Sequence, residues 1–216
     1  MIKLFGYWRS TAAYRVRIAL NIKQVSYNGL SVHLVKDGGQ QNTPDYMALN
    51  PQALVPLLVD NDFKINQSMA IIEYLEEKYP RPQLLPTDFE SRAKVRAICQ
   101  MIACDVHPLN NLRVLQYLKG TLKISDEQKN DWYSHWITKG FTAIESLLSD
   151  YGEKGPFAFG RHLTMADIFL VSQVYNANRF EVDLSAFSRI CSINEHCMSL
   201  SAFQDAAPEN QPDAVR

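Results

Sequence analysis

Two hydroxyl groups stand where a short apolar segment gives way to a helix, in the stretch "WRSTAAYRVRIAL" at residues 8–20. They belong to Ser10 and Thr11, and no cysteine, histidine or carboxylate adjoins them. A helix start presents unpaired N–H groups and the positive end of the helix dipole, so a thiolate placed there is stabilised. A hydroxyl can donate one more hydrogen bond to that sulfur. The alternative is a plain Ser/Thr helix cap, and this stretch alone leaves both interpretations open.

Two further segments could bind parts of an extended ligand. In "NPQALVPLLVD" (50–60), a Val-Pro step precedes a strand, and proline is the residue before which a cis bond costs little. Such a step would leave the N–H and C=O of Val55 free to pair with a peptide, although a proline at a strand's first position explains it equally. In "INQSMAIIEYLEEKYP" (65–80), Gln67 and Ser68 begin a helix whose N-terminus suits a carboxylate, with simple capping again the alternative.

The first eighty residues alternate strand and helix patterns. Strand character occupies 2–8 and returns at 25–35, and short strands at 55–60 and 63–66 flank a turn. Apolar residues at helical spacing after Thr11 and again after Ser68 predict two helices, the second ending at Pro80. The predicted order is β-α-β followed by β-β-α.

The remainder of the chain has helical periodicity. A proline-rich stretch at 80–86 reads as a linker, and helical patterns follow at 88–119, at 126–149 and from Thr164, with an interruption expected at Pro108. Thr164 and Asp167 form a capping box, to which we assign a structural role. We therefore expect an α+β protein, with an α/β domain at 1–80, a linker at 81–87 and an all-helical domain at 88–216. The polar tail at 207–216 is expected to be loosely ordered.

Composition excludes several classes of protein. The formal net charge of −1 does not favour nucleic-acid binding, and no apolar run approaches the roughly 18 residues of a membrane span. The start of the chain lacks signal-peptide features, and the four cysteines match neither redox nor zinc spacings. The five histidines form no metal-binding pair. We expect a cytoplasmic protein without a metal, a membrane or a nucleic acid as its partner.

Taken together, two helix N-termini and a Val-Pro edge within one small unit suit a short anionic peptide that carries a thiol, and glutathione fits that description. At this point the chain resembles the glutathione transferases, and more narrowly their zeta class. The resemblance spans nearly the whole chain and rests on "YWRSTAAYRVRIAL", "ALNPQALVPLLV", "QSMAIIEYLEEKYP", "HPLNNLRVL", "LTMADIFLVSQVYNANRF" and "VDLSAF". It implies a thioredoxin-like first domain, a helical second domain and a homodimer.

The resemblance also assigns residues. Ser10 or Thr11, with Ser10 the first choice, would contact the glutathione sulfur. Gln41 and the main chain of Val55 would bind the glutathione backbone, and Gln67 and Ser68 its γ-glutamyl end. His107, Asn111 and Arg113 fall in the segment that lines the family's cleft. The chain departs from the family at Ala12, where the zeta signature has cysteine, so a mechanism that needs an enzyme thiol there is excluded.

A dicarboxylate substrate requires cations, and arginine meets a carboxylate with two parallel hydrogen bonds. Arg9 adjoins the sulfur-binding turn, Arg179 in "NANRF" matches a family position that binds substrate carboxylate, and Arg113 is a third candidate. Arg15 and Arg17 lie in the first predicted helix, and the sequence is compatible both with a packing role and with a substrate-binding role for each.

The activity implied is glutathione-dependent cis–trans isomerisation of maleylacetoacetate to fumarylacetoacetate, in tyrosine and phenylalanine breakdown. Maleylpyruvate isomerisation is the nearest alternative. A transferase acting on small halogenated acids is the second, and a non-catalytic glutathione-binding protein is the third.

Overall fold

The chain forms two compact units in the computed structural model, which describes residues 1–151 and 154–215. The first unit contains Met1–Gln83 together with the segment from Ser199 onwards, and the second contains Leu84–Met198. The helical unit therefore ends at Met198, short of the expected boundary at 216, because the C-terminal segment packs with the first unit. Within the described residues, no helix is long and apolar enough to cross a membrane.

Four strands of the first unit form one mixed sheet. They are β1 (Ile2–Gly6), β2 (Tyr27–Ser31), β3 (Leu57–Asp60) and β4 (Phe63–Asn66), in the spatial order β2-β1-β3-β4. β1 runs parallel to β2 and antiparallel to β3, which is antiparallel to β4. The crossover between β1 and β2 is α1 (Thr11–Ile22), and α3 (Ser68–Lys78) follows β4. The predicted β-α-β and β-β-α units are confirmed, and a further helix lies between them.

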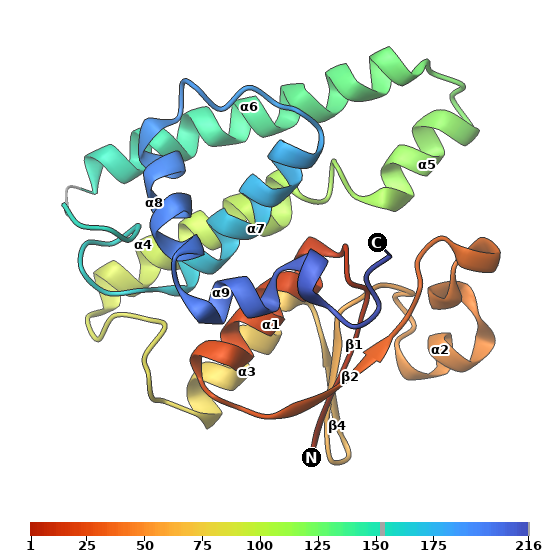
Figure 1. Cartoon of the computed structure of the whole chain (residues 1–216), viewed down its shortest axis with the longest axis horizontal. Coiled ribbons are helices and arrows are strands. Elements are labelled where there is room, and N and C mark those ends of the chain that lie inside the picture. The colour runs from red at the N-terminus through yellow and green to blue at the C-terminus, as the bar shows by residue number, and fades with distance from the viewer. Residues whose placement is uncertain (152–153, 216) are drawn as a thin grey trace. The chain divides into compact units, whose positions relative to one another are not determined.

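Helices cover both sides of this sheet. α1 and α3 lie on one side of the strands and α2 (Pro44–Leu49) on the other (Figure 1). Tyr46 of α2 reaches Phe5 of β1, with ring centroids 6.2 Å apart. α2 and the 3₁₀ turns at Lys36–Gly38 and Gln40–Asn42 were not predicted from the sequence. They carry Gln41, one of the candidate residues.

The C-terminal segment is docked on the first unit through α1, and within the tail at 207–216, which was expected to be loosely ordered, Asp213 accepts from the Trp8 N–H at 3.2 Å. Tyr14, Arg17 and Asn21 share one face of α1, since they are three and four residues apart. Their side chains donate to the carbonyls of Phe203 (3.3 Å), Ala206 (3.0 Å) and Ala202 (3.1 Å) in α9 (Ser201–Ala206). The carbonyls of Phe203 and Ala206 belong to the end of α9, where carbonyl groups have no partner within the helix, so these donors fix α9 to the first unit.

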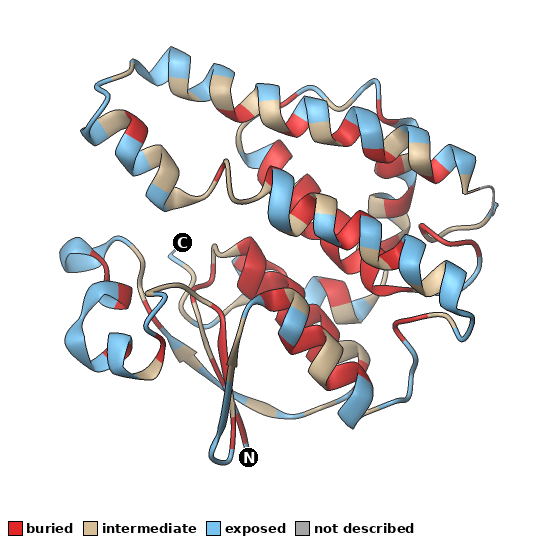
Figure 2. Ribbon diagram, turned by 180° about the vertical axis from the view of Figure 1, so that it is seen from behind, coloured by how far each residue is buried: buried red, intermediate tan, exposed pale blue. Residues whose placement is uncertain are grey.

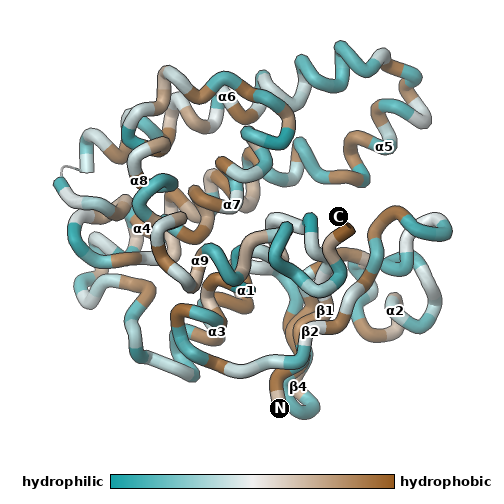
Figure 3. Tube along the Cα trace, in the orientation of Figure 1, coloured by the Kyte–Doolittle hydropathy of each residue, from teal (hydrophilic) through white to brown (hydrophobic). Residues whose placement is uncertain are grey.

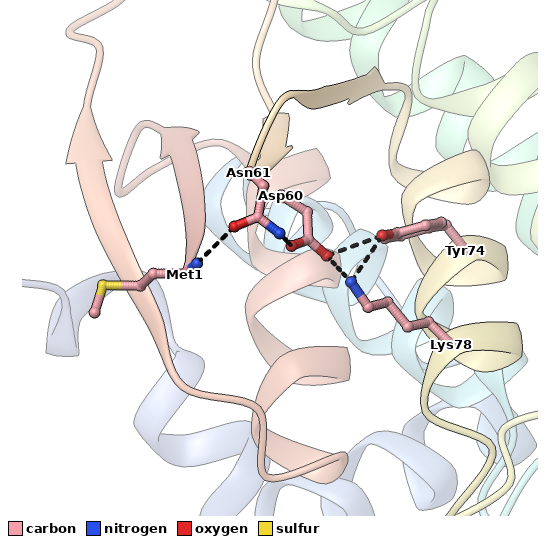
Figure 4. Close-up of polar contacts among 5 residues, drawn as sticks. All are labelled: Met1, Asp60, Asn61, Tyr74 and Lys78. Atoms are coloured by element: carbon pink, nitrogen blue, oxygen red, sulfur yellow. Dashed lines mark hydrogen bonds and ion pairs between the residues drawn. The ribbon is translucent and has the colours of Figure 1, made fainter.

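A polar cluster joins the end of β3 to α3 (Figure 4). One carboxylate oxygen of Asp60 accepts from the Tyr74 hydroxyl at 2.8 Å and from the Lys78 ammonium. The other accepts from the Asn61 amide at 3.3 Å, and Asn61 in turn accepts from the N-terminal ammonium of Met1 at 3.2 Å. The hydrogen bond from Lys78 lowers the pKa of the Asp60 carboxyl.

The second unit is helical. Its elements are α4 (Phe89–Gln100), a π-helical segment (Met101–Val106), α5 (Leu112–Gly120), α6 (Asp126–Asp150), α7 (Met165–Arg179) and α8 (Ser188–Met198). The predicted interruption at Pro108 is confirmed, because α5 begins only at Leu112. α7 is buried over most of its length (Figure 2), whereas α6 shows alternating polar and apolar stripes (Figure 3).

The predicted capping box begins α7. Asp167 is fully buried, and its carboxylate accepts from the Thr164 N–H (2.7 Å), the Thr164 hydroxyl (3.0 Å) and the Ala158 N–H (2.6 Å). All three donors come from the polypeptide just before α7, so Asp167 organises a turn of the core, and the structural role assigned from the sequence is confirmed.

Candidate functional site

The turn Tyr7–Ser10 connects β1 to α1 and presents one accessible hydroxyl. Ser10 is the N-cap of α1: its Oγ accepts from the Ala13 N–H at 3.2 Å, and its own N–H donates to the Tyr7 carbonyl at 2.9 Å. Its side chain is half-exposed, whereas Thr11 is only 2% exposed. A capping hydroxyl uses its oxygen as acceptor and keeps its proton for a further partner. Ser10 can therefore cap α1 and also donate a hydrogen bond to a ligand. The two interpretations that the sequence allowed are thus compatible with each other.

Arg9 projects from the same turn. Its guanidinium lies 4.2 Å from the centroid of the Trp8 ring, and Trp8 is itself buried. A cation over an indole face is attracted by the ring's quadrupole. Arg9 is thus held beside Ser10 by a rigid aromatic side chain.

Val55 offers two main-chain groups to a ligand. The Val55–Pro56 peptide bond is cis. Within the described ranges, neither the N–H nor the C=O of Val55 has a hydrogen-bond partner. The preceding carbonyl of Leu54, in contrast, accepts from the Tyr46 hydroxyl at 2.7 Å and from the Asn50 amide at 2.8 Å. Burial raises the pKa of Tyr46 to about 12, so this anchor stays protonated at neutral pH.

The start of α3 combines a left-handed residue with a buried cation. Gln67 has φ of +69°, which a non-glycine residue adopts only where its surroundings impose it, and its amide donates to the Gln52 side chain at 2.8 Å. Ser68 is buried, and its Oγ accepts from Nη1 of Arg15 at 3.3 Å. Arg15 lies on α1 and is 1% exposed. A buried guanidinium and a helix N-terminus both favour a carboxylate at Gln67 and Ser68.

Gln41 is a buried amide with an unused acceptor. Its Nε2 donates to the Leu34 carbonyl at 3.3 Å, while its Oε1 has no partner in the part of the chain that the structure describes. An unsatisfied buried acceptor is costly, so a ligand donor there would be favourable. Ser10, Gln41, Val55, Gln67 and Ser68 all belong to the first unit.

The remaining candidates belong to the second unit. Asn111 is the N-cap of α5 and accepts from the Arg113 N–H at 3.2 Å, and Arg113 is exposed. His107 is half-exposed, at the end of the π-helical segment. The loop between them is fixed to α6, because Asn110 donates to the Tyr133 carbonyl at 3.2 Å and Trp132 to the Leu109 carbonyl at 2.8 Å.

Arg179 is exposed at the last turn of α7, and its guanidinium lies 5.1 Å from the Phe180 ring. That ring stacks on Tyr133 with centroids 3.6 Å apart. Burial raises the pKa of the Tyr133 hydroxyl, and the positive charge of Arg179 opposes this rise. Tyr133 thus links the His107–Arg113 loop to Arg179, a connection that sequence reasoning missed.

Comparisons with known proteins agree with this geometry. Residues 1–77 match the family model for the glutathione S-transferase N-terminal domain. A probable maleylacetoacetate isomerase of Vibrio cholerae is 51% identical, over 98% of this chain and 97% of its own. A maleylpyruvate isomerase of a Ralstonia species is 45% identical, over 99% and 100% of the two chains.

Solved structures give the same result. The holo structure of a bacterial zeta-class maleylpyruvate isomerase superimposes with a TM-score of 0.96 at 45% identity, covering 99% of this chain and 100% of that one. A maleylacetoacetate isomerase of Methylobacterium extorquens, solved with malonate and glutathione bound, has a TM-score of 0.94 at 37% identity, covering 99% and 100%. The chain belongs to the glutathione transferase family, and within that family to the zeta class with the maleylacetoacetate isomerases. The expected thioredoxin-like and helical fold is confirmed.

Proposed function

We propose that this chain is a glutathione-dependent cis–trans isomerase that converts maleylacetoacetate to fumarylacetoacetate. The observation that carries the proposal is the half-exposed Ser10 hydroxyl at the N-terminus of α1, with alanine at position 12. The turn is equipped to hold an ionised sulfur but contains no thiol of its own. The nucleophile therefore arrives on a ligand.

Bound glutathione supplies the thiolate, which adds to the conjugated double bond and leaves once the resulting single bond has rotated. The protein lowers the pKa of that thiol through the α1 amides and the Ser10 hydroxyl. Val55 pairs with the peptide main chain as a short added strand, and Gln41 accepts a further hydrogen bond. Gln67 and Ser68, backed by the Arg15 charge, hold the γ-glutamyl carboxylate.

We assign the substrate's carboxylates to Arg9, Arg113 and Arg179. Bidentate contacts fix both ends of the molecule, so that rotation about the central bond gives the trans isomer. Positive charge also stabilises the enolate that forms when sulfur adds to the alkene. His107 and Asn111, at the loop anchored on Tyr133, are proposed to help bind glutathione.

We also propose the finer assignments that follow from the zeta class. The protein acts in the cytoplasm as a homodimer, in tyrosine and phenylalanine breakdown. Its glutathione-binding domain spans 1–80, its linker 81–87 and its substrate domain starts at 88, with the C-terminal segment docked on the first unit.

The test is an absorbance assay of maleylacetoacetate isomerisation with and without glutathione, on the wild type and on Ser10→Ala. We expect turnover only with glutathione, complete recovery of free glutathione, and a large loss of rate in the variant. A rate indifferent to glutathione would refute the proposal. If the protein bound glutathione tightly but showed no turnover, it would be a glutathione-binding protein without catalytic activity.

A second candidate, maleylpyruvate isomerisation, is favoured by the maleylpyruvate isomerase structure with its TM-score of 0.96. The ratio of kcat/KM values for the two acids decides between these substrates. Stoichiometric consumption of glutathione with halogenated acids would instead indicate a conjugating transferase.

A further inference from the structure

The docked C-terminal segment reaches the turn that carries Ser10. Asp213 is half-exposed, and one oxygen of its carboxylate accepts from the main-chain N–H of Trp8 at 3.2 Å. The same oxygen accepts from the Ser31 hydroxyl, at the end of β2, at 2.6 Å. A single carboxylate therefore ties the tail both to the edge strand and to the turn between β1 and α1.

One peptide unit separates Asp213 from Ser10. The N–H of Trp8 and the C=O of Tyr7 belong to the same planar peptide group, so they move together. That C=O accepts the N–H of Ser10 at 2.9 Å. The hydrogen-bonded chain thus runs from the Asp213 carboxylate through the Tyr7–Trp8 peptide to the backbone of Ser10, and successive bonds in such a chain polarise one another.

The next peptide unit is held from the other side. Nη2 of Arg17 donates to the carbonyl of Trp8 at 3.0 Å, and Nε of Arg17 donates to Ala206 in α9. Arg17 and Asp213 therefore fix both peptide planes that flank Trp8. Trp8 also carries the ring on which Arg9 lies. The orientation of Arg9 and Ser10 depends on groups that come from outside the turn.

We propose that Asp213 is a positioning residue for the proposed reaction: by holding the Tyr7–Trp8 peptide, it sets where the Ser10 hydroxyl and the first α1 amides meet the glutathione sulfur. This inference rests on the proposed function and deepens it. It assigns Asp213 no contact with glutathione or substrate. The expected signature is a change in thiol ionisation and in kcat, with glutathione affinity largely kept, because Val55, Gln67 and Ser68 are untouched.

Three variants separate this role from simple docking of the tail. Asp213→Ala removes the acceptor of both bonds, Asp213→Asn keeps an oxygen acceptor of the same size, and Ser31→Ala removes only the tie to β2. For each we would measure kcat, KM for glutathione, the pKa of the bound glutathione thiol from its thiolate absorbance, and amide hydrogen exchange at Ser10 without ligand.

In Asp213→Ala we expect the thiol pKa to rise by about one unit and kcat at neutral pH to fall roughly tenfold. Exchange at Ser10 should accelerate, and Asp213→Asn and Ser31→Ala should stay close to wild type. The inference is wrong if Asp213→Ala behaves as wild type or if Asp213→Asn shows the same loss of kcat as Asp213→Ala. It is also wrong if Ser31→Ala lowers kcat as much as Asp213→Ala does. If the wild-type protein left the pKa of the bound glutathione thiol unchanged, the proposed function would be wrong instead. Amide hydrogen exchange at Ser10 would still test the role of Asp213.

Discussion

Replacing Ser10 by alanine removes two interactions at once, and their sizes can be estimated separately. The first is the cap on α1, where Ser10 Oγ accepts from the Ala13 N–H at 3.2 Å. Loss of such a cap costs about 1 kcal/mol. In a chain of this length that lowers the thermal midpoint by roughly 3 °C.

The second interaction is the hydrogen bond that Ser10 donates to the thiolate of glutathione. A hydrogen bond to a charged group contributes about 1.5–3 kcal/mol. Because 1.36 kcal/mol corresponds to one pKa unit, the thiol pKa should rise by about 1–2 units in the variant. Below that pKa the thiolate fraction falls in proportion, so the isomerisation rate should fall by about 10- to 100-fold and recover as the pH is raised.

Thr11→Val is the matched control, since Thr11 is buried and Ser10 is half-exposed. It should shift the thermal midpoint and leave the thiol pKa near the wild-type value. Both variants would be titrated by thiolate absorbance in the glutathione complex and assayed across pH. If Thr11→Val raised the thiol pKa more than Ser10→Ala, the assignment of the sulfur to Ser10 would be refuted.

Three further outcomes follow from contacts elsewhere. Arg17→Met leaves two buried carbonyls without donors, at about 1–3 kcal/mol each, and should lower the free energy of unfolding in urea by roughly 2–6 kcal/mol; a wild-type midpoint would contradict this. Because Lys78 lowers the pKa of folded Asp60, the stability from that pair is present above the unfolded pKa and is lost as pH falls through the folded one. Asp60→Asn should therefore flatten the acid limb of the thermal midpoint against pH, and identical limbs would show that the pair contributes nothing. Arg179→Gln should raise KM for the dicarboxylate about tenfold while KM for glutathione stays constant, and an unchanged substrate KM would exclude Arg179 from carboxylate binding.

Local signals made much of the first unit predictable. The β-α-β and β-β-α successions and the Ser10 cap depend on residues close together in sequence, as does the Thr164–Asp167 box of the second unit, and the structure contains all of them. The segment 36–49 was missed because it holds two 3₁₀ turns and a six-residue helix, which are too short for periodicity to register. Gln41, in one of those turns, was found only through the family resemblance.

The docking of the tail could not be predicted because its partners are far apart. The bond from Trp8 to Asp213 spans 205 residues, and the polar composition of 207–216 favoured exposure. One signal was available: in "TAAYRVRIAL" two arginines interrupt an otherwise apolar helix, and buried cations require acceptors. Arg17 donates to the carbonyls of Ala206 in α9 and of Trp8, and Arg15 donates to the Ser68 hydroxyl. The structure thereby separates the two arginines from the solvent-exposed Arg113 and Arg179.

The central claim is that the nucleophilic sulfur belongs to bound glutathione, held at the start of α1, and not to the protein. A crystal structure of the glutathione complex tests it most directly. The account predicts a sulfur atom within hydrogen-bonding distance of Ser10 Oγ and the cysteinyl main chain of glutathione paired with both polar groups of Val55. A sulfur turned away from α1, with Val55 unengaged, would contradict it.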